Sequence, residues 1–259
     1  MISKTFRSAR MIVLASFALS SAFGATCSNA SLSGTYGFLH DGTDSNGAPA
    51  TAAVTQITFD STTGTFTGEQ TASHDGVIAT ESVTGIYTVA SNCTGTGTPA
   101  VGSPFSLVVT STGFLALHLF AEGFAVKQGS PNCTNAGVEG SFGFETTGVF
   151  LAGAPSTGAV AFIGELKLTV SPSGEGVING HLASSDDGTF QTFAEEPVTG
   201  SYRVGTDCRG RATITPTGLS EMHFKLVVVD GGNKILAIET DADTVVSGTL
   251  ENNDLLQSF

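Results

Sequence analysis

A string of eleven residues occurs twice in this chain, and its repetition limits the possible folds more than any other feature. VTGIYTVASNC spans residues 83–93, and VTGSYRVGTDC spans residues 198–208. Four further segments recur in the same order, including CSNASLSGTYGF at 27–38 and CTNAGVEGSFGF at 133–144. The offset between copies grows from 106 to 121, so the copies differ mainly in loop length. The sequence therefore predicts a tandem duplication of one folding unit.

The N-terminus has the pattern of a secretory signal peptide. Three basic residues within the first ten precede an apolar run over 11–23, and small residues follow. We expect cleavage after Gly24, which gives a signal peptide at 1–24, a first repeat at 25–131 and a second at 132–259. The protein is therefore predicted to be secreted, into the extracellular space, the periplasm or the cell envelope.

A lipoprotein signal would also end at a cysteine, but the residues before Cys27 depart from the usual lipobox. No later segment has the 18 or more apolar residues that a spanning helix needs. We therefore expect no membrane span in the mature protein.

The charge balance is strongly acidic. The whole chain has a net charge of −13, and after the predicted cleavage seven basic and 23 acidic residues remain, a net charge of −16. Nucleic acids and anionic lipids draw their protein affinity from Lys and Arg. Neither is therefore an expected partner.

The spacing of turn residues predicts an all-β fold. Short β-type runs are separated by turn sequences such as DSTTG at 60–64, HDG at 74–76 and DGGN at 230–233, and no sustained helical period is present. About eight strands fit into each copy, which favours two small up-and-down antiparallel barrels. A β-sandwich is the rival arrangement. The strands expected in the first copy lie near 34–39, 51–59, 64–72, 77–90, 94–98, 104–111, 114–120 and 123–128.

Alternation along the repeated string separates an inner face from an outer one. Val, Gly, Tyr and Val at alternate positions form the predicted inner face, which places Tyr87 and Tyr202 inside the barrels as candidate ligand-binding residues. The two copies differ on the outer face, where Thr88 is replaced by Arg203. Divided labour between the copies is therefore expected to concern surface partners.

Four cysteines remain after the predicted cleavage, and they correspond in pairs between the repeats. Three connectivities are possible. Duplication favours one bridge per unit, Cys27 with Cys93 and Cys133 with Cys208. No Cys-x-x-Cys motif is present, so we expect structural disulfides, no metal site and no cofactor.

Polar residues inside an apolar strand are the remaining candidates for chemistry. His118 in FLALHLF aligns with Glu239 in KILAIET, and each is predicted to share a strand face with alternate apolar residues. Such a group could orient a ligand or act as an acid or base if the face points inward, and it is merely solvated if the face points outward. The other histidines do not recur between the copies, so no shared histidine site is expected.

The SGTYGF segment together with TGIYTVASNCTGT and TGSYRVGTDCRGR resembles uncharacterised secreted bacterial proteins that look like relatives of the allene oxide cyclase and dirigent barrels. The resemblance covers both repeats, but its motifs consist of Gly, Thr, Tyr and Cys. It implies small barrels that hold apolar molecules, as calycin-like proteins do. No catalytic residue is carried over, because no local motif of those enzymes is matched.

Three functional hypotheses follow. The leading one is a non-enzymatic secreted protein that binds a small apolar ligand or serves as an envelope or matrix component. The second is an isomerase or cyclase that uses His118 or Glu239. The third is an outer-membrane barrel ending at Phe259, which the lack of Trp and the presence of only three Tyr disfavour. The oligomeric state stays open.

Overall fold

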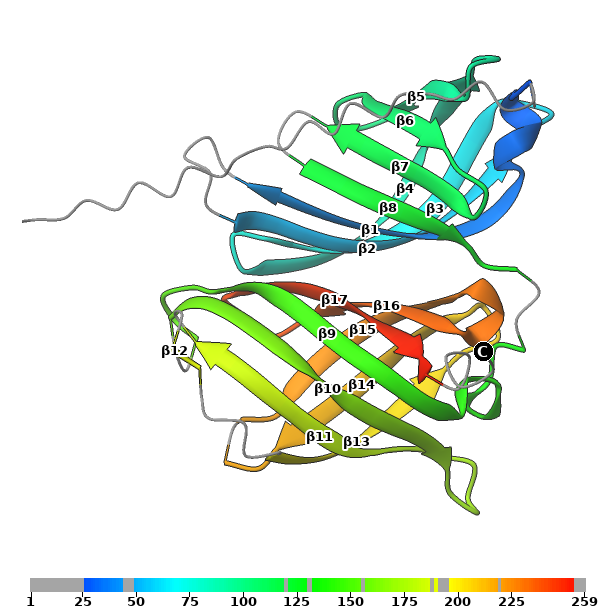
Figure 1. Cartoon of the computed structure of the whole chain (residues 1–259). Coiled ribbons are helices and arrows are strands. Elements are labelled where there is room, and N and C mark those ends of the chain that lie inside the picture. The colour runs from blue at the N-terminus through cyan, green and yellow to red at the C-terminus, as the bar shows by residue number, and fades with distance from the viewer. Residues whose placement is uncertain are drawn as a thin grey trace, which may run out of the picture.

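The computed structural model describes residues 26–43, 49–118, 121–129, 132–154, 157–186, 189–190, 196–218 and 220–253 of the 259-residue chain. These residues form two β-barrels, one from each repeat (Figure 1). The predicted signal peptide and its cleavage site lie outside the described residues. Within them, no helix has the length and apolar character needed to span a membrane.

The first repeat forms a closed antiparallel barrel, here called barrel 1. Each strand pairs with the next along the chain, and the last pairs with the first. The predicted barrel is therefore confirmed, and the sandwich is excluded for this repeat because there is one closed sheet. The elements are the 3₁₀ helix η1 (Asn29–Leu32), then β1 (Gly34–Thr43), β2 (Pro49–Asp60), β3 (Thr65–His74), β4 (Val77–Val89), β5 (Thr94–Pro99), β6 (Phe105–Val109), β7 (Gly113–His118) and β8 (Ala121–Lys127).

The second repeat forms barrel 2 in the same way. Its last strand, β17, pairs with its first, β9; β11 pairs with both β10 and β13, and the two-residue strand β12 pairs only with the end of β11. The elements are η2 (Asn135–Val138), β9 (Gly140–Phe150), β10 (Gly158–Val170), β11 (Gly176–Asp186), β12 (Thr189–Phe190), β13 (Glu196–Val204), β14 (Arg209–Pro216), β15 (Met222–Val229), η3 (Asp230–Gly232), β16 (Lys234–Glu239) and β17 (Thr244–Asn252).

The repeated string is β4 in one barrel and β13 in the other, and its faces are oriented as predicted. Tyr87 and Tyr202 are 2% and 5% exposed and belong to the barrel cores. A side chain at Gly85 would meet the ring of Phe66 and the carbonyl oxygen of Thr98 at 2.4 Å. Glycine is thus required where this strand bends tightly against its neighbours.

Each barrel has its own disulfide, with the predicted pairing. Cys27 is bonded to Cys93 and Cys133 to Cys208, with Cα–Cα distances of 4.9 and 4.8 Å. Each bridge ties the segment before the first strand to the last residue of the repeated string. In the chain-entropy model, closing loops of this size stabilises the fold by roughly 4 kcal/mol each.

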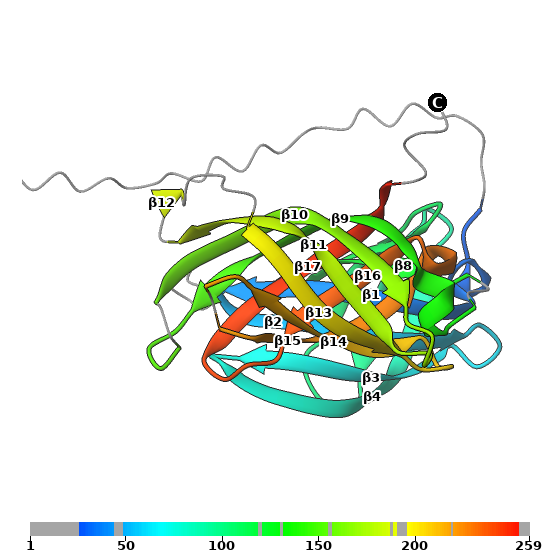
Figure 2. The same cartoon turned by 90° about the horizontal axis from the view of Figure 1, so that it is seen from below.

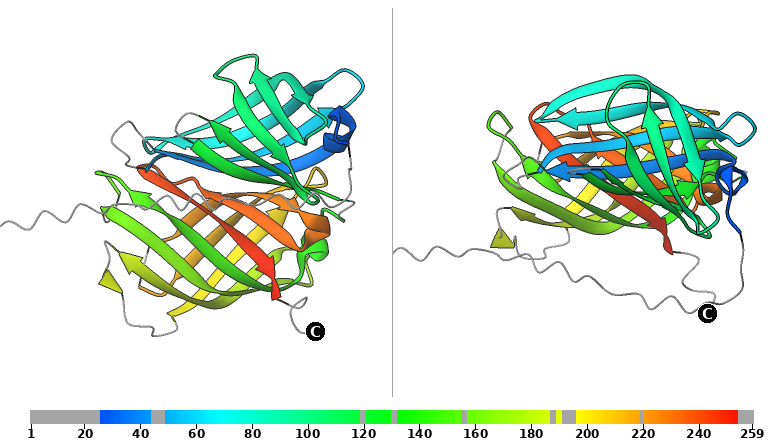
Figure 3. Two further views of the ribbon diagram at one scale, coloured as in Figure 1. Left: turned by 45° about the horizontal axis from the view of Figure 1, so that its top comes forward. Right: turned by 90° about the horizontal axis from the view of Figure 1, so that it is seen from above.

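The two barrels pack against each other through their outer faces. In Figure 1, β1 and β2 lie along β16 and β17, and the turned views in Figure 3 show the same contact. A separate apolar cluster fills this contact, here called the inter-barrel interface. Its buried members are Leu39, Ala52 and Val54 from barrel 1 and Val227, Val229, Leu236, Ile238 and Val245 from barrel 2.

Polar contacts surround the inter-barrel interface. The amide of Gln128 donates to the carbonyl oxygen of Val228 at 3.1 Å, and the Ser247 hydroxyl donates to Asp41 Oδ1 at 2.5 Å. Arg209 of barrel 2 forms an ion pair with Glu69 of barrel 1. The interface therefore has an apolar centre and a polar margin.

The interface uses different faces of the two repeats. Val227, Leu236 and Ile238 are 3%, 0% and 0% exposed in barrel 2. The residues at the same positions of barrel 1 are Val108, Leu115 and Leu117, which are 47%, 54% and 62% exposed. The contact is therefore heterologous, and it leaves one matching face free on barrel 1.

Candidate functional site

One end of each barrel is closed by a short 3₁₀ helix that is fixed to the repeated string. The hydroxyl of Tyr87 donates to the carbonyl oxygen of Asn29 at 3.0 Å, and Asn29 Oδ1 accepts from the backbone N–H of Val89 at 2.8 Å. In barrel 2, Tyr202 and Asn135 form the same two bonds at 2.9 and 2.8 Å.

Tyr87 and Tyr202, the predicted ligand-binding residues, therefore hold the 3₁₀ helices at the barrel ends. Burial raises the pKa of Tyr202 to about 12, and the charge of Glu139 adds to the effect. Both hydroxyls therefore stay protonated and donate to the protein's own backbone. A role for Tyr87 and Tyr202 in ligand binding stays a prediction.

Farther along barrel 1, polar side chains occupy inner positions. His118 follows Phe114 and Ala116 on the inner side of β7, and its charge is near enough to act on His40 of β1. Burial, then the charges of His74 and His118, lower the pKa of His40 to about 4. The buried His40 Nδ1 has no hydrogen-bond partner among the described residues.

Barrel 2 carries a carboxyl group at the position of His118. Glu239 is 2% exposed, and burial, with a smaller contribution from Asp241, raises its pKa to about 8. Its Oε2 atom and the hydroxyl of Thr146, which is at the position of His40, have no hydrogen-bond partner among the described residues. The structure thus places His118 and Glu239 at equivalent inner positions, and Glu239 is mostly protonated at neutral pH.

The apolar centre of each barrel is closely packed. The apolar centre of barrel 2 holds a cavity of about 20 Å³, which suits one water molecule at most. Drug-sized ligands need roughly 300–1,000 Å³. In barrel 1 the Phe59 ring contacts those of Tyr87 and Phe114, with centroids 4.8 and 5.5 Å apart. The middle of each barrel is therefore a packed core.

The outer face of barrel 2 carries a feature that the sequence reasoning found only in part. Arg203 on β13 lies directly opposite Arg211 on β14, which lies directly opposite Lys225 on β15. All three side chains are exposed, and we call them the cationic row. Figure 2 shows these three strands side by side. The replacement of Thr88 by Arg203 pointed to this face, but the row appears only once strand register is known.

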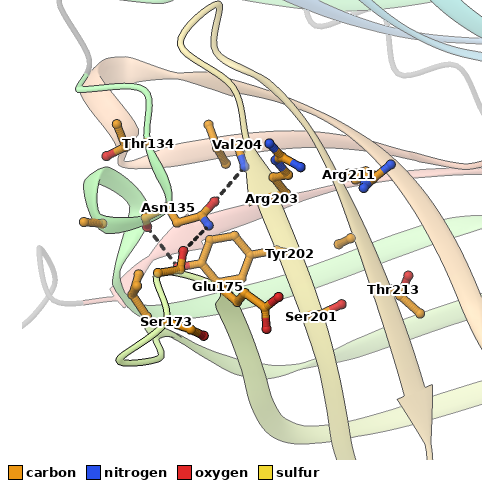
Figure 4. Close-up of a pocket in the computed structure, with 15 residues that line it drawn as sticks. Thr134, Asn135, Ser173, Glu175, Ser201, Tyr202, Arg203, Val204, Arg211 and Thr213 are labelled. Atoms are coloured by element: carbon orange, nitrogen blue, oxygen red, sulfur yellow. Dashed lines mark hydrogen bonds between the residues drawn. The ribbon is translucent and has the colours of Figure 1, made fainter.

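A cleft of about 670 Å³ lies at one end of the cationic row (Figure 4). It is bounded by η2, by the β10–β11 turn and by β13 and β14, and most of its labelled side chains are polar. Its lining includes Thr134, Asn135, Ser173, Glu175, Ser201, Tyr202, Arg203, Arg211 and Thr213. A second, shallower groove of about 360 Å³ joins the row to Glu69, Asp207 and Arg209 at the seam between the barrels.

Comparison with known proteins assigns no family. No family model and no curated protein matches the chain. Among solved structures, a protein with unknown function from the DUF3598 family of Nostoc punctiforme is 10% identical, with 86% of this chain and 96% of that chain covered and a TM-score of 0.27.

An AttH candidate from Nitrosomonas europaea is 8% identical, with 85% of this chain and 92% of that chain covered and a TM-score of 0.28. TM-scores this low carry no argument about fold or function. The architecture therefore rests on the strand pairing of the chain itself.

Proposed function

We propose that this chain is a secreted, non-enzymatic protein of the envelope or extracellular matrix that acts through its outer surfaces. The observation that carries the proposal is the packed apolar centre of barrel 2, where the cavity measures about 20 Å³. A protein that stored an apolar ligand inside its barrels would need a cavity more than ten times larger. The small apolar ligand remains the weaker form of the proposal.

The proposed compartment is supported by covalent chemistry. Both disulfides lie within small units, and such bridges persist in oxidising compartments. The signal-peptide pattern at 1–24 and the acidic composition agree with a location outside the cytoplasm.

A titration with a neutral fluorescent apolar probe, N-phenyl-1-naphthylamine, tests whether the interior is closed. The wild-type protein should give no saturable increase in fluorescence. Leu166→Ala is the positive control for a second titration with benzene, because Leu166 is 0% exposed in the core of barrel 2 and its truncation opens an apolar cavity of about the size of that small probe. Saturable one-to-one binding by the wild type would overturn the filled-barrel proposal.

A second candidate, an isomerase or cyclase, is favoured by one observation. Glu239 is a buried carboxyl group with a pKa of about 8 and an unpartnered oxygen, and such a group can donate a proton at neutral pH. The resemblance of the chain's sequence to the allene oxide cyclase and dirigent barrels also favours this candidate. Once a turnover is found, the double variant His118→Gln, Glu239→Gln should abolish it, and unchanged turnover would eliminate this candidate.

A further inference from the structure

We propose that the cationic row of barrel 2 binds an acidic polysaccharide that carries about one carboxylate per sugar. The inference names a class of partner for the proposed function. It rests on that function, because it assumes that the protein acts through its outer surface. It uses neither the barrel interiors nor the disulfides.

The row concentrates positive charge in an acidic protein. Counting Arg209 beside it, four of the seven basic residues after residue 24 lie on β14 and its two neighbours. Like charges directly opposite each other on neighbouring strands repel and destabilise a sheet. The arrangement therefore costs stability unless an anion offsets it.

The cations of the row have no acidic partner in the described part of the chain, whereas Arg209 does. Arg209 forms ion pairs with Glu69 and Asp207, the latter at 2.7 Å. No ion pair or side-chain hydrogen bond forms on Arg203, Arg211 or Lys225 among the described residues. Three carboxylates lie near the row, Glu175 in the cleft and Glu69 and Asp207 in the shallower groove. Against the four cations, Arg209 included, they leave a local charge of +1.

The first repeat shows what the same positions look like without this charge. Thr88 lies opposite Thr96, which lies opposite Ser106, and the two threonine hydroxyls are hydrogen bonded at 3.1 Å. The barrel therefore folds with neutral residues at these positions. Three cations are a property of the second copy alone.

The number of cations and their surroundings favour a sugar polymer over a nucleic acid. A protein that binds duplex DNA makes on the order of six to ten phosphate contacts, whereas the row supplies three cations in a chain with seven basic residues after residue 24. Arginine forks bind carboxylates through two hydrogen bonds, and Thr134, Ser173, Ser201 and Thr213 line the adjacent cleft with hydroxyls. Tyr202, the aromatic residue in the cleft lining, is buried and bonded to Asn135, so it cannot stack on a base.

Retention on immobilised polygalacturonate tests the site. The wild-type protein should be retained at low salt and released by rising salt, with no retention on neutral dextran. The variant Arg203→Thr, Arg211→Thr, Lys225→Ser carries the first repeat's residues and should bind at least tenfold more weakly. Because it removes repulsion, it should also fold, which its thermal transition verifies.

Two further variants separate a site from a charge effect. Thr88→Glu, Thr96→Glu, Ser106→Glu changes the net charge by the same amount in barrel 1 and should leave retention unchanged. Thr88→Arg, Thr96→Arg, Ser106→Lys builds a second row and should strengthen retention. If the triple Glu variant lost as much retention as the variant that removes the cationic row, the proposal would be overturned, because the net charge of the protein would then explain the binding.

Other outcomes also decide the matter. Tighter binding of single-stranded DNA than of polygalacturonate would overturn the proposal. So would concentration-dependent dimers that the row variant abolishes, since the row would then bind acidic residues of a second copy. If the wild-type protein is not retained on polygalacturonate and does not bind the apolar probe, the polysaccharide partner is refuted and the proposed surface role stands. If the wild-type protein binds the apolar probe, the proposed surface role itself is refuted.

Discussion

Two buried titratable groups set the charge inside the barrels. His40 has a pKa of about 4 and Glu239 a pKa of about 8, and in each case burial is the largest cause. Both groups are therefore mainly neutral near pH 7. Two unlike residues keep the barrel interiors uncharged because a buried charge without a partner is costly.

Glu239→Gln should change how stability depends on pH. The wild-type fold keeps a proton on Glu239 between about pH 4.5 and 8, where the unfolded chain loses it, so the free energy of unfolding falls as pH rises through this range. The loss amounts to about 4 kcal/mol by linkage. The Gln variant should lack it when denaturant unfolding is measured at pH 5 and pH 8. Parallel wild-type and variant curves would contradict the assigned burial.

His40 gives the opposite dependence at acid pH. Its lowered pKa means that the unfolded chain takes up a proton between about pH 6.5 and 4 while the fold does not. Stability should therefore fall as pH drops through this range. Replacement by Thr, the residue at the equivalent position in barrel 2, should weaken this acid loss in the same denaturation series.

Among the strands, β1 and β9 are equivalent in sequence but not in surroundings. A side chain at Gly37 of β1 would meet Val229, Val227 and Leu236 of barrel 2 at 2.5 to 3.0 Å. At Gly143 of β9 it would meet the Asn253 side chain at 3.2 Å, which can move aside. The same glycine therefore serves close barrel packing in one copy and has a more open position in the other.

Gly37→Val should disrupt the inter-barrel interface. Overpacking of this kind costs about 1–3 kcal/mol. Calorimetry should show the barrels unfolding less cooperatively, with a lower first transition. Gly143→Val is the matched control and should leave the transition close to that of the wild type. Equal effects of the two variants would show that glycine is needed within each barrel and not for their contact.

The repeat and its period-two alternation allowed prediction of the barrels, the disulfides and the inner face of β4. The inter-barrel contact could not be predicted in this way. The runs FSLVV at 105–109 and FKLVV at 224–228 are nearly the same, yet the outer residue is exposed at Val108 and buried at Val227. An apolar run indicates a strand suited to burial on both faces, but what covers the outer face depends on the other barrel.

The candidate site could be predicted only in part, because the sequence does not show which residues of neighbouring strands lie opposite each other. His118 and Glu239 were found because each interrupts an apolar strand. The cationic row joins three strands, and residues 203, 211 and 225 have no regular spacing along the chain. A strand-by-strand alignment of the two copies matches Thr88, Thr96 and Ser106 with the three cations. That the three cations lie next to each other could be recognised only once the strand pairing was known.

At the scale of the whole molecule, the inter-barrel interface joins two different faces of the repeated unit. It joins the β1–β2 face of one copy to the β15–β17 face of the other, and such head-to-tail contacts can repeat without end. The free face of barrel 2 that corresponds to β1–β2 carries Glu145 and Glu165 where barrel 1 has Leu39 and Gln56. We expect these acids to prevent a second molecule from continuing the series.

Glu145→Leu, Glu165→Gln should therefore promote self-association. Ile163 is 59% exposed between these positions and would dock on the free apolar face of barrel 1 that includes Leu115 and Leu117. Sedimentation velocity should show a concentration-dependent shift towards dimers and larger species. Adding Leu115→Glu should reverse the shift. If this third change has no effect, association uses another surface.

The positions of the two disulfides also have a mechanical consequence. The bridges at 27–93 and 133–208 enclose β1–β4 and β9–β13, so these strands cannot lengthen when the chain is pulled from its ends. Only β5–β8 and β14–β17 lie outside the loops and can unravel. Under load the protein would therefore yield in two limited steps and then hold.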